Sequence, residues 1–185
     1  SLNSDLRRKA KTINFGIIYG ISPYGLSAQL DISNSEAKQY IESYFKKYPG
    51  IKEYMDKTVK DCRSKGYVAT PFGRRIFIPF INDKMANRRN FAERSAINAP
   101  IQGGAADLIK LAMPKIYKFL TKEKLMSKML IQVHDELIFE VPQNEVNIMK
   151  EKIPTIMTNS HYNFLDLKVP IKVDLGLGKN WDEAN

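Results

Sequence analysis

Two cations and two aromatic rings recur at four-residue intervals near the start of the chain: Arg7, Lys11, Phe15 and Tyr19. Four helical steps turn the chain by about 400°, so each side chain lies about 40° from the one before, on one stripe of a helix. Arg can fork onto phosphate oxygens, Lys supplies a movable point charge, and a ring can stack on a base or sugar. The stripe is about 18 Å long, which suits a nucleoside triphosphate. The spacing is equally typical of an amphipathic helix with solvated cations and a core-facing Phe and Tyr.

Two adjacent carboxylates, Asp135 and Glu136, separate apolar runs at residues 129–133 and 137–141. The runs predict a β-hairpin with a polar tip. A desolvated hairpin floor would make two uncompensated carboxylates costly unless a cation joins them. Hard oxygen ligands suit Mg²⁺, and two Mg²⁺ ions about 4 Å apart can activate a hydroxyl and stabilise a leaving phosphate. A solvated turn that contains Asp and Glu is the competing interpretation.

A third four-residue series consists of Arg94, Asn98 and Gln102. A helix that continued past Ala99 would align them, although Pro100 can distort its last turn. Amides that face the acceptors shared by all base pairs in the minor groove can check base-pair shape without reading sequence. Polar residues on a solvated helix surface would show the same spacing. Other basic residues are candidates either for DNA backbone contacts or for solvated surface charges: Arg74, Arg75, Lys84, Arg88 and Arg89.

The elements that must carry these residues are predicted from capping residues, apolar periodicity and β-branched texture, and their order indicates an α+β fold. The first expected elements are a helix at 6–19 with a cap at Asn3 or Ser4 and a stop at Gly20, a helix after Ser35 that ends at Pro49, and a helix at 51–65. A hairpin or extended arm at 67–81 follows, and then a helix at 84–98 that pauses at Pro100 and Gly103-Gly104 and resumes through 120. The last elements are the acidic hairpin, a helix at 144–159 and a strand at 169–175.

The composition favours a polyanionic partner only weakly. Lys and Arg outnumber Asp and Glu by 29 to 20, which gives a formal charge of +9, but an acidic protein or anionic membrane would satisfy the same charge. The single Cys62 can form no internal disulfide, which indicates a reducing compartment, and His134 and His161 lack metal-ligand spacing. The longest apolar runs fall far short of the roughly 20 residues that a membrane helix needs, so we expect a soluble protein. The chain opens on Ser1 rather than Met, and we expect it to be a piece of a longer protein.

Three strings connect these series to a known family. Residues 7–20 read Arg-Arg-Lys-Ala-Lys-Thr-Ile-Asn-Phe-Gly-Ile-Ile-Tyr-Gly, residues 93–108 read Glu-Arg-Ser-Ala-Ile-Asn-Ala-Pro-Ile-Gln-Gly-Gly-Ala-Ala-Asp-Leu, and residues 132–137 read Gln-Val-His-Asp-Glu-Leu. They resemble the fingers-helix signature, the stretch leading into the palm and the acidic hairpin of the family A DNA polymerases, bacterial members in particular. The resemblance implies an α+β fold with a helical fingers portion at 1–84, followed at 85–185 by part of an antiparallel palm sheet with flanking helices.

The resemblance implies an order of roles along the first helix. Arg7 and Lys11 would hold the β- and γ-phosphates of an incoming deoxynucleotide, and Lys11 would protonate the departing pyrophosphate. Phe15 would stack over the new base and sugar, and Tyr19 would close the end of the pocket. Gly16 would permit a close approach of the template or of neighbouring backbone. Phe rather than Tyr at position 15 predicts poor acceptance of terminators that lack a 3′-hydroxyl.

The resemblance also implies roles on the hairpin and on the helix before it. Asp135 would bind catalytic metal and Glu136 would assist beside it, with two Mg²⁺ ions in the complete enzyme. His134 would lie against the primer terminus and Gln132 would reach the primer-side minor groove. In the third series, Asn98 and Gln102 would sense the minor groove, with Arg94 beside the primer.

A complete family member needs a second metal-binding Asp in an upstream string like Asp-Tyr-Ser-Gln-Ile-Glu, and this sequence contains no such string. The thumb and any exonuclease domain are missing as well, so this piece alone is not expected to polymerise. The implied partners are primer-template DNA, deoxynucleoside triphosphates and the remaining domains of the longer protein. A cytoplasmic, nucleoid-associated bacterial protein is expected, and an organellar origin stays open because the N-terminus is missing.

Two other functions fit parts of the pattern. A single-subunit RNA polymerase shares the Arg, Lys and aromatic series, but its acidic hairpin normally reads His-Asp-Ser rather than His134-Asp135-Glu136. A non-catalytic DNA-binding or interaction module that keeps the polymerase surface is the alternative from another class.

Overall fold

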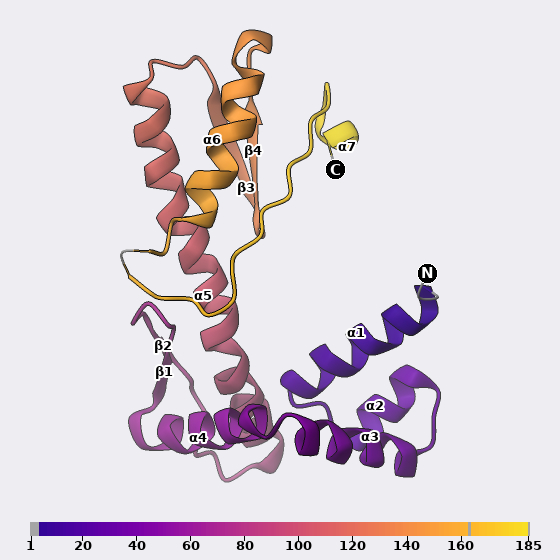
Figure 1. The fold of residues 1–185 in the computed structure, drawn as a ribbon. Coiled ribbons are helices and arrows are strands. Elements are labelled where there is room, and N and C mark those ends of the chain that lie inside the picture. The colour runs from indigo at the N-terminus through magenta and orange to yellow at the C-terminus, as the bar shows by residue number, and fades with distance from the viewer. Residues whose placement is uncertain (1–3, 163, 185) are drawn as a thin grey trace. The chain divides into compact units, whose positions relative to one another are not determined.

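The computed structural model describes residues 4–162 and 164–184 of the 185-residue chain. It confirms the predicted α+β class, with helices and two separate antiparallel hairpins (Figure 1). The chain divides into two compact units, Ser1–Ile101 and Gln102–Asn185, each with its own hydrophobic cluster. The elements are α1 (Ser4–Ile18), α2 (Pro23–Leu30), α3 (Asn34–Lys47), α4 (Pro49–Lys65), β1 (Tyr67–Ala69), β2 (Arg75–Phe77), α5 (Ala86–Lys122), β3 (Lys128–Val133), β4 (Glu136–Glu140), η1 (Gln143–Glu145), α6 (Val146–Thr158) and α7 (Trp181–Ala184).

The end of α1 follows its sequence signal. Gly20 has a φ of 73°, and the N–H of Ile21 donates to the carbonyl of Gly16 at 2.8 Å. These are features of a Schellman motif, in which glycine is favoured because only it adopts the left-handed conformation without steric cost. Of the two expected caps, Ser4 is the first residue of α1 and Asn3 lies outside the described residues.

The sequence patterns did not predict α2, although its start carries a usable signal. Ser22 Oγ accepts a hydrogen bond from the N–H of Gly25 at 3.1 Å, and Pro23 occupies the first helical position, as is common at helix starts. The helix has only 8 residues and ends at Asp31, whose φ is 54°. So short a helix shows little apolar periodicity and depends on tertiary packing, here through the fully buried Leu26.

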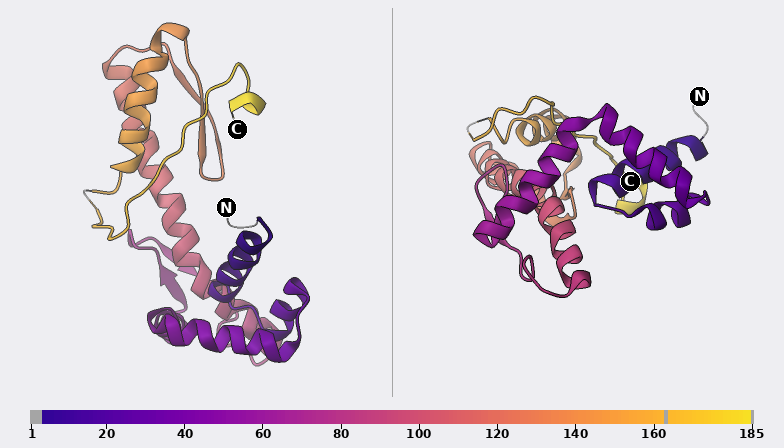
Figure 2. Two further views of the ribbon diagram at one scale, coloured as in Figure 1. Left: turned by 45° about the vertical axis from the view of Figure 1, so that its right-hand side comes forward. Right: turned by 90° about the horizontal axis from the view of Figure 1, so that it is seen from below.

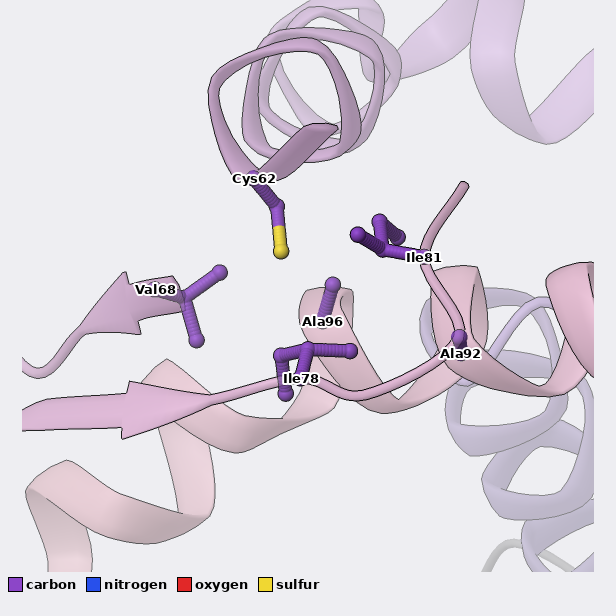
Figure 3. Close-up of a cluster of buried hydrophobic side chains, with 6 residues drawn as sticks. All are labelled: Cys62, Val68, Ile78, Ile81, Ala92 and Ala96. Carbon is purple, nitrogen blue, oxygen red and sulfur yellow. The ribbon is translucent and has the colours of Figure 1, made fainter. Parts of the chain in front are cut away.

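The core of the first unit lies between α4, the β1–β2 hairpin and the N-terminal part of α5. The two strands are antiparallel, with Tyr67 opposite Phe77. Cys62 of α4 points into a cluster of small and β-branched side chains, shown in Figure 3: Val68, Ile78, Ile81, Ala92 and Ala96. Ala92 and Ala96 are 2% and 0% exposed, and they lie on one face of α5. Their burial in the cluster fixes the rotation of α5 about its own axis.

The predicted pause in α5 is wrong, because α5 is a single helix of 37 residues. The pause was expected because Pro100 cannot donate to the carbonyl of Ala96 and because glycine costs about 1 kcal/mol against alanine inside a helix. In the structure Pro100, Gly103 and Gly104 are all buried, so packing offsets these local penalties. Among the described residues, neither α5 nor another helix is long and apolar enough to cross a membrane.

The second unit contains the predicted acidic hairpin. β3 and β4 are antiparallel, with Val133 opposite Glu136 at the tip and an irregularity between Met129 and Ile131. The hairpin lies beside α6 and the C-terminal part of α5, as Figures 1 and 2 show. The predicted helix at 144–159 corresponds to η1 and α6. The cluster that joins these elements contains Ala112, Ile116, Leu120, Met149 and Ile153, with Leu137 and Phe139 packed against it.

A buried carboxylate connects η1 to the start of β3. Glu145 accepts hydrogen bonds from the N–H of Met126 at 2.8 Å and from the N–H and hydroxyl of Ser127. The Ser127 hydroxyl, followed by the Met126 amide, lowers the pKa of the Glu145 carboxyl because both stabilise its charged form. Glu145 thereby fixes the turn from which β3 begins.

The predicted strand at 169–175 is wrong, because in the described part of the chain these residues belong to no strand. A strand needs a neighbouring edge for its backbone N–H and C=O groups, and residues of high β-propensity do not supply that edge themselves. Val169 is 75% exposed, so most of its side chain is open to water rather than packed on a sheet.

Replacing Glu145 with Gln should lower the urea midpoint and speed amide exchange at Met126 and Ser127, because the charged acceptor is lost. The carboxylate contributes its full stability above its ordinary pKa of 4.5 and loses it as pH falls through the lower pKa of the folded state. Acid should therefore destabilise the Gln variant less than the wild type in that window. The exposed Glu151→Gln variant serves as the control, and identical pH profiles for wild type and Glu145→Gln would contradict the assignment.

Candidate functional site

Three side chains of the first series lie on the accessible face of α1, and the fourth, Tyr19, follows the helix and is half-buried. Arg7 and Lys11 are exposed, and Phe15 is 47% exposed, whereas Ile17 is the residue of this helix that is buried at 1%. The Phe15 and Tyr19 rings stack with centroids 5.9 Å apart and planes 28° apart. The Lys11 ammonium lies 5.9 Å from the Phe15 ring centroid. Phe15 is thus not core-facing, and α1 presents a cation next to a stacked aromatic pair.

The C-terminal end of α1 contacts the helix that carries the third series. A Cβ on Gly20 would lie 3.0 Å from Cγ of Arg94, so the arginine stem packs directly against this turn. A Cβ on Gly16 would instead lie 3.1 Å from Cγ2 of Ile21. The nearest atoms to this position belong to the Ile21 side chain, and the expected close approach of the template or of neighbouring backbone to Gly16 stays a prediction.

A pocket of about 890 Å³ opens beside this contact within the first unit. One wall is the turn after α1, and the others are α4 and the start of α5. Glu93 of α5 forms an ion pair with Arg63 of α4, and this pair joins the two helices beside the pocket. Arg89, one turn earlier on α5, has its Nε atom 3.9 Å from Oε1 of Glu93. The polar residues in the lining are Ser22, Asp56, Lys60, Arg63, Ser64, Asn90, Glu93 and Arg94.

The third series lies on uninterrupted helix, as its four-residue spacing requires. Arg94 and Gln102 are exposed, whereas Asn98 is half-buried. Its Oδ1 atom is buried and has no hydrogen-bond partner in the described structure. An unpaired buried amide oxygen is uncommon in folded proteins, so Asn98 is under-satisfied by the described residues around it.

The tip of the acidic hairpin is a two-residue loop between paired Val133 and Glu136. His134 in this loop has a φ of 51°, a left-handed conformation that two-residue hairpin loops use and in which His, like Asn and Asp, is enriched. Gln132 Nε2 donates to the His134 carbonyl at 3.2 Å and so braces the loop from β3. In this structure the Gln132 amide thus contacts the loop itself, and its expected reach to DNA stays a prediction.

The side chains of Asp135 and Glu136 are exposed, which corrects the expected desolvated hairpin floor. Water can hydrate both carboxylates, so burial does not by itself demand a cation. Exposed adjacent carboxylates remain hard oxygen donors of the kind that Mg²⁺ prefers, and the pair fits part of a ligand set. Within residues 4–162 and 164–184, no three or more His, Cys, Asp or Glu side chains are grouped to hold a metal.

Two contacts beside the third series were not anticipated from the sequence. Tyr54 Oη of α4 donates to the Ile97 carbonyl of α5 at 3.0 Å, and Arg63 pairs with Glu93. Both join residues at least 30 positions apart, and spacing rules within one element carry no signal for them. The sequence offers one signal for the first contact, which is the tyrosine itself. A tyrosine hydroxyl at a helix interface usually has a hydrogen-bond partner.

The family model of DNA polymerase family A matches residues 1–183. The chain belongs to this family. DNA polymerase I of Lactococcus lactis subsp. cremoris is 49% identical over 178 residues, which is 96% of this chain and 20% of the relative. DNA polymerase I of Rhizobium leguminosarum is 50% identical over 183 residues, which is 98% of this chain and 18% of the relative.

A solved structure of the polymerase domain of Pol1 from M. smegmatis, in complex with DNA primer-template and dNTP, superimposes with a TM-score of 0.93. It is 40% identical and covers 100% of this chain and 32% of that one. The family A chain described here thus spans about a fifth of the length of its curated relatives.

Replacing Gly20 with Ala should destabilise the first unit by about 1–2 kcal/mol, because the left-handed conformation disfavours a Cβ and Arg94 crowds it. Gly50 is the matched control, since it lies in α4 and a Cβ added there would meet nothing within 4 Å. Gly50→Ala should stabilise by about 0.5–1 kcal/mol. Denaturant unfolding measures both, and changes of the same sign would contradict the assigned role of Gly20.

Proposed function

We propose that the longer protein containing this chain is a DNA-directed DNA polymerase that adds deoxynucleotides to a primer 3′ end. The observation that carries the proposal is the exposed face of α1 in a family A chain, where Lys11 adjoins the stacked Phe15 and Tyr19. The solved relative with DNA primer-template and dNTP supports the same substrates. In this proposal residues 1–84 belong to the fingers and residues 85–185 to the palm.

The incoming deoxynucleotide would lie along α1 in the order of its side chains. Arg7 and Lys11 are exposed cations and would hold the phosphates, with the Lys11 ammonium as proton donor to the departing pyrophosphate. Phe15 and Tyr19 would contact the base and sugar, because stacked rings offer a flat apolar surface. The triphosphate therefore meets charge at one end of the helix and aromatic surface at the other.

Family A polymerases generally use divalent metal ions, and we propose Mg²⁺ for this protein. Asp135 would supply carboxylate oxygens with Glu136 beside it, and the remaining ligands would come from the longer protein. When bound, two such ions lower the pKa of the primer hydroxyl and stabilise charge on the leaving phosphate. The exposure of both carboxylates leaves their oxygens accessible for this role.

Primer-template DNA would contact both units. Arg94, Asn98 and Gln102 of α5 would face the minor groove and primer, and Gln132 and His134 would approach the primer terminus. We also propose that the remaining domains of the longer protein are partners of this chain and that the protein is cytoplasmic.

Asp135→Ala in the longer protein should reduce primer extension by about 10³-fold or more while duplex binding stays nearly unchanged, since metal binding contributes several kcal/mol to the transition state. Extension is measured with a labelled primer-template, and binding by fluorescence anisotropy. The exposed Asp166→Ala variant in the same unit is the control. Surviving extension in Asp135→Ala, with binding intact, would favour a non-catalytic DNA-binding module or a different metal site.

Phe15→Tyr in the longer protein should improve incorporation of dideoxynucleotides relative to deoxynucleotides by about tenfold. The tyrosine hydroxyl would supply a hydrogen-bonding group where the terminator lacks its 3′-hydroxyl, and one such bond is worth about that factor. Single-nucleotide incorporation with competing substrates gives the ratio. Comparable use of both substrates by the wild-type enzyme would contradict the assignment of Phe15 to the sugar.

A further inference from the structure

The rotation of α5 decides where two of its proposed DNA contacts lie. Ala92 and Ala96 belong to the buried cluster around Cys62 (Figure 3). Arg94 and Asn98 each follow one of these alanines by two residues, and two helical steps turn the chain by about 200°. Their side chains therefore leave the helix nearly opposite the face that the cluster holds.

The turn of α5 that carries Asn98 is weakened by Pro100. Proline has no N–H, so the Ala96 carbonyl loses its helical donor, and the ring crowds that carbonyl. Such positions are where helices bend. Ala92 and Ala96 bury little surface, and the backbone hydrogen bonding of this turn is incomplete. The direction of the helix axis at this turn therefore depends on further contacts.

Tyr54 supplies such a contact from α4. Its hydroxyl donates to the Ile97 carbonyl at 3.0 Å, one residue before Asn98 and within the turn that precedes Pro100. Ile97 is 5% exposed and Tyr54 is 36% exposed, so this hydrogen bond is partly buried. Burial raises the pKa of the Tyr54 hydroxyl, and a hydrogen bond with the Thr58 side chain opposes this effect.

We propose that Tyr54 is a positioning residue for base-pair checking, because its hydrogen bond to the Ile97 carbonyl holds the turn of α5 from which Asn98 faces the primer-template minor groove. The inference rests on the proposed polymerase function and extends it to a residue outside the three sequence series. Asn98 is suited to such control, since the described residues leave its Oδ1 without a partner that would fix the side chain. A shift of the backbone at Ile97 would therefore move this amide.

The test uses the full-length polymerase and compares Tyr54→Phe with Tyr40→Phe. Tyr40 lies on α3 and is 51% exposed, so it controls for the loss of a tyrosine hydroxyl elsewhere in the first unit. Steady-state kcat and KM are measured for extension of a matched and a mispaired primer terminus. Tyr54→Phe should reduce the ratio of matched to mispaired kcat/KM by about three- to tenfold, the effect of one hydrogen bond, and Tyr40→Phe should leave it unchanged.

A double-variant cycle with Asn98→Ala separates positioning from a general loss of stability. If Tyr54 acts through Asn98, adding Tyr54→Phe to Asn98→Ala should change the discrimination ratio no further. Additive effects, or a Tyr54→Phe ratio equal to wild type, would overturn the inference, and so would a lower melting temperature with unchanged discrimination. A wild-type protein that extends no primer would instead overturn the proposed function itself.

Discussion

The packing of α5 against the core of the first unit governs where Arg94 and Asn98 can lie. Ala92 and Ala96 pack among Cys62, Val68 and Ile78 only in one rotation of the helix, because their small side chains form one narrow face. The same rotation turns Arg94 away from that core and against the turn at the end of α1. A few buried methyl groups thus determine the direction of polar side chains that make no contribution to the cluster.

Two local departures from ordinary protein structure coincide with residues of proposed function. Phe15 is 47% exposed, and Asn98 Oδ1 is buried without a described partner. Each carries a local cost, through exposed apolar surface or lost hydrogen bonding. Departures from local consistency are expected at working sites, where the surface is complementary to a ligand rather than to the protein itself.

Elements with strong local signals were predictable, whereas those held by distant contacts were not. The Schellman end of α1 and the β3–β4 hairpin depend on a glycine and on apolar alternation, which are properties of a few neighbouring residues. The continuity of α5 through Pro100 depends on burial, and penalties estimated from local propensity cannot include it. The segment at 169–175 shows the reverse case, in which β-branched residues lack a paired edge.

The sequence by itself determined the family and the chemical types of the site: the Arg, Lys and aromatic order of α1 and the carboxylate pair at the hairpin tip. Helical angle and hairpin alternation are fixed by backbone geometry, so spacing alone assigns residues to one face. Only the tertiary structure decided that the hairpin carboxylates are exposed, that Ile21 lies beside Gly16, and that the Tyr54 hydroxyl donates to the Ile97 carbonyl. These outcomes depend on which surfaces pack together across long sequence separations, and no local pattern encodes the packing of side chains from different elements.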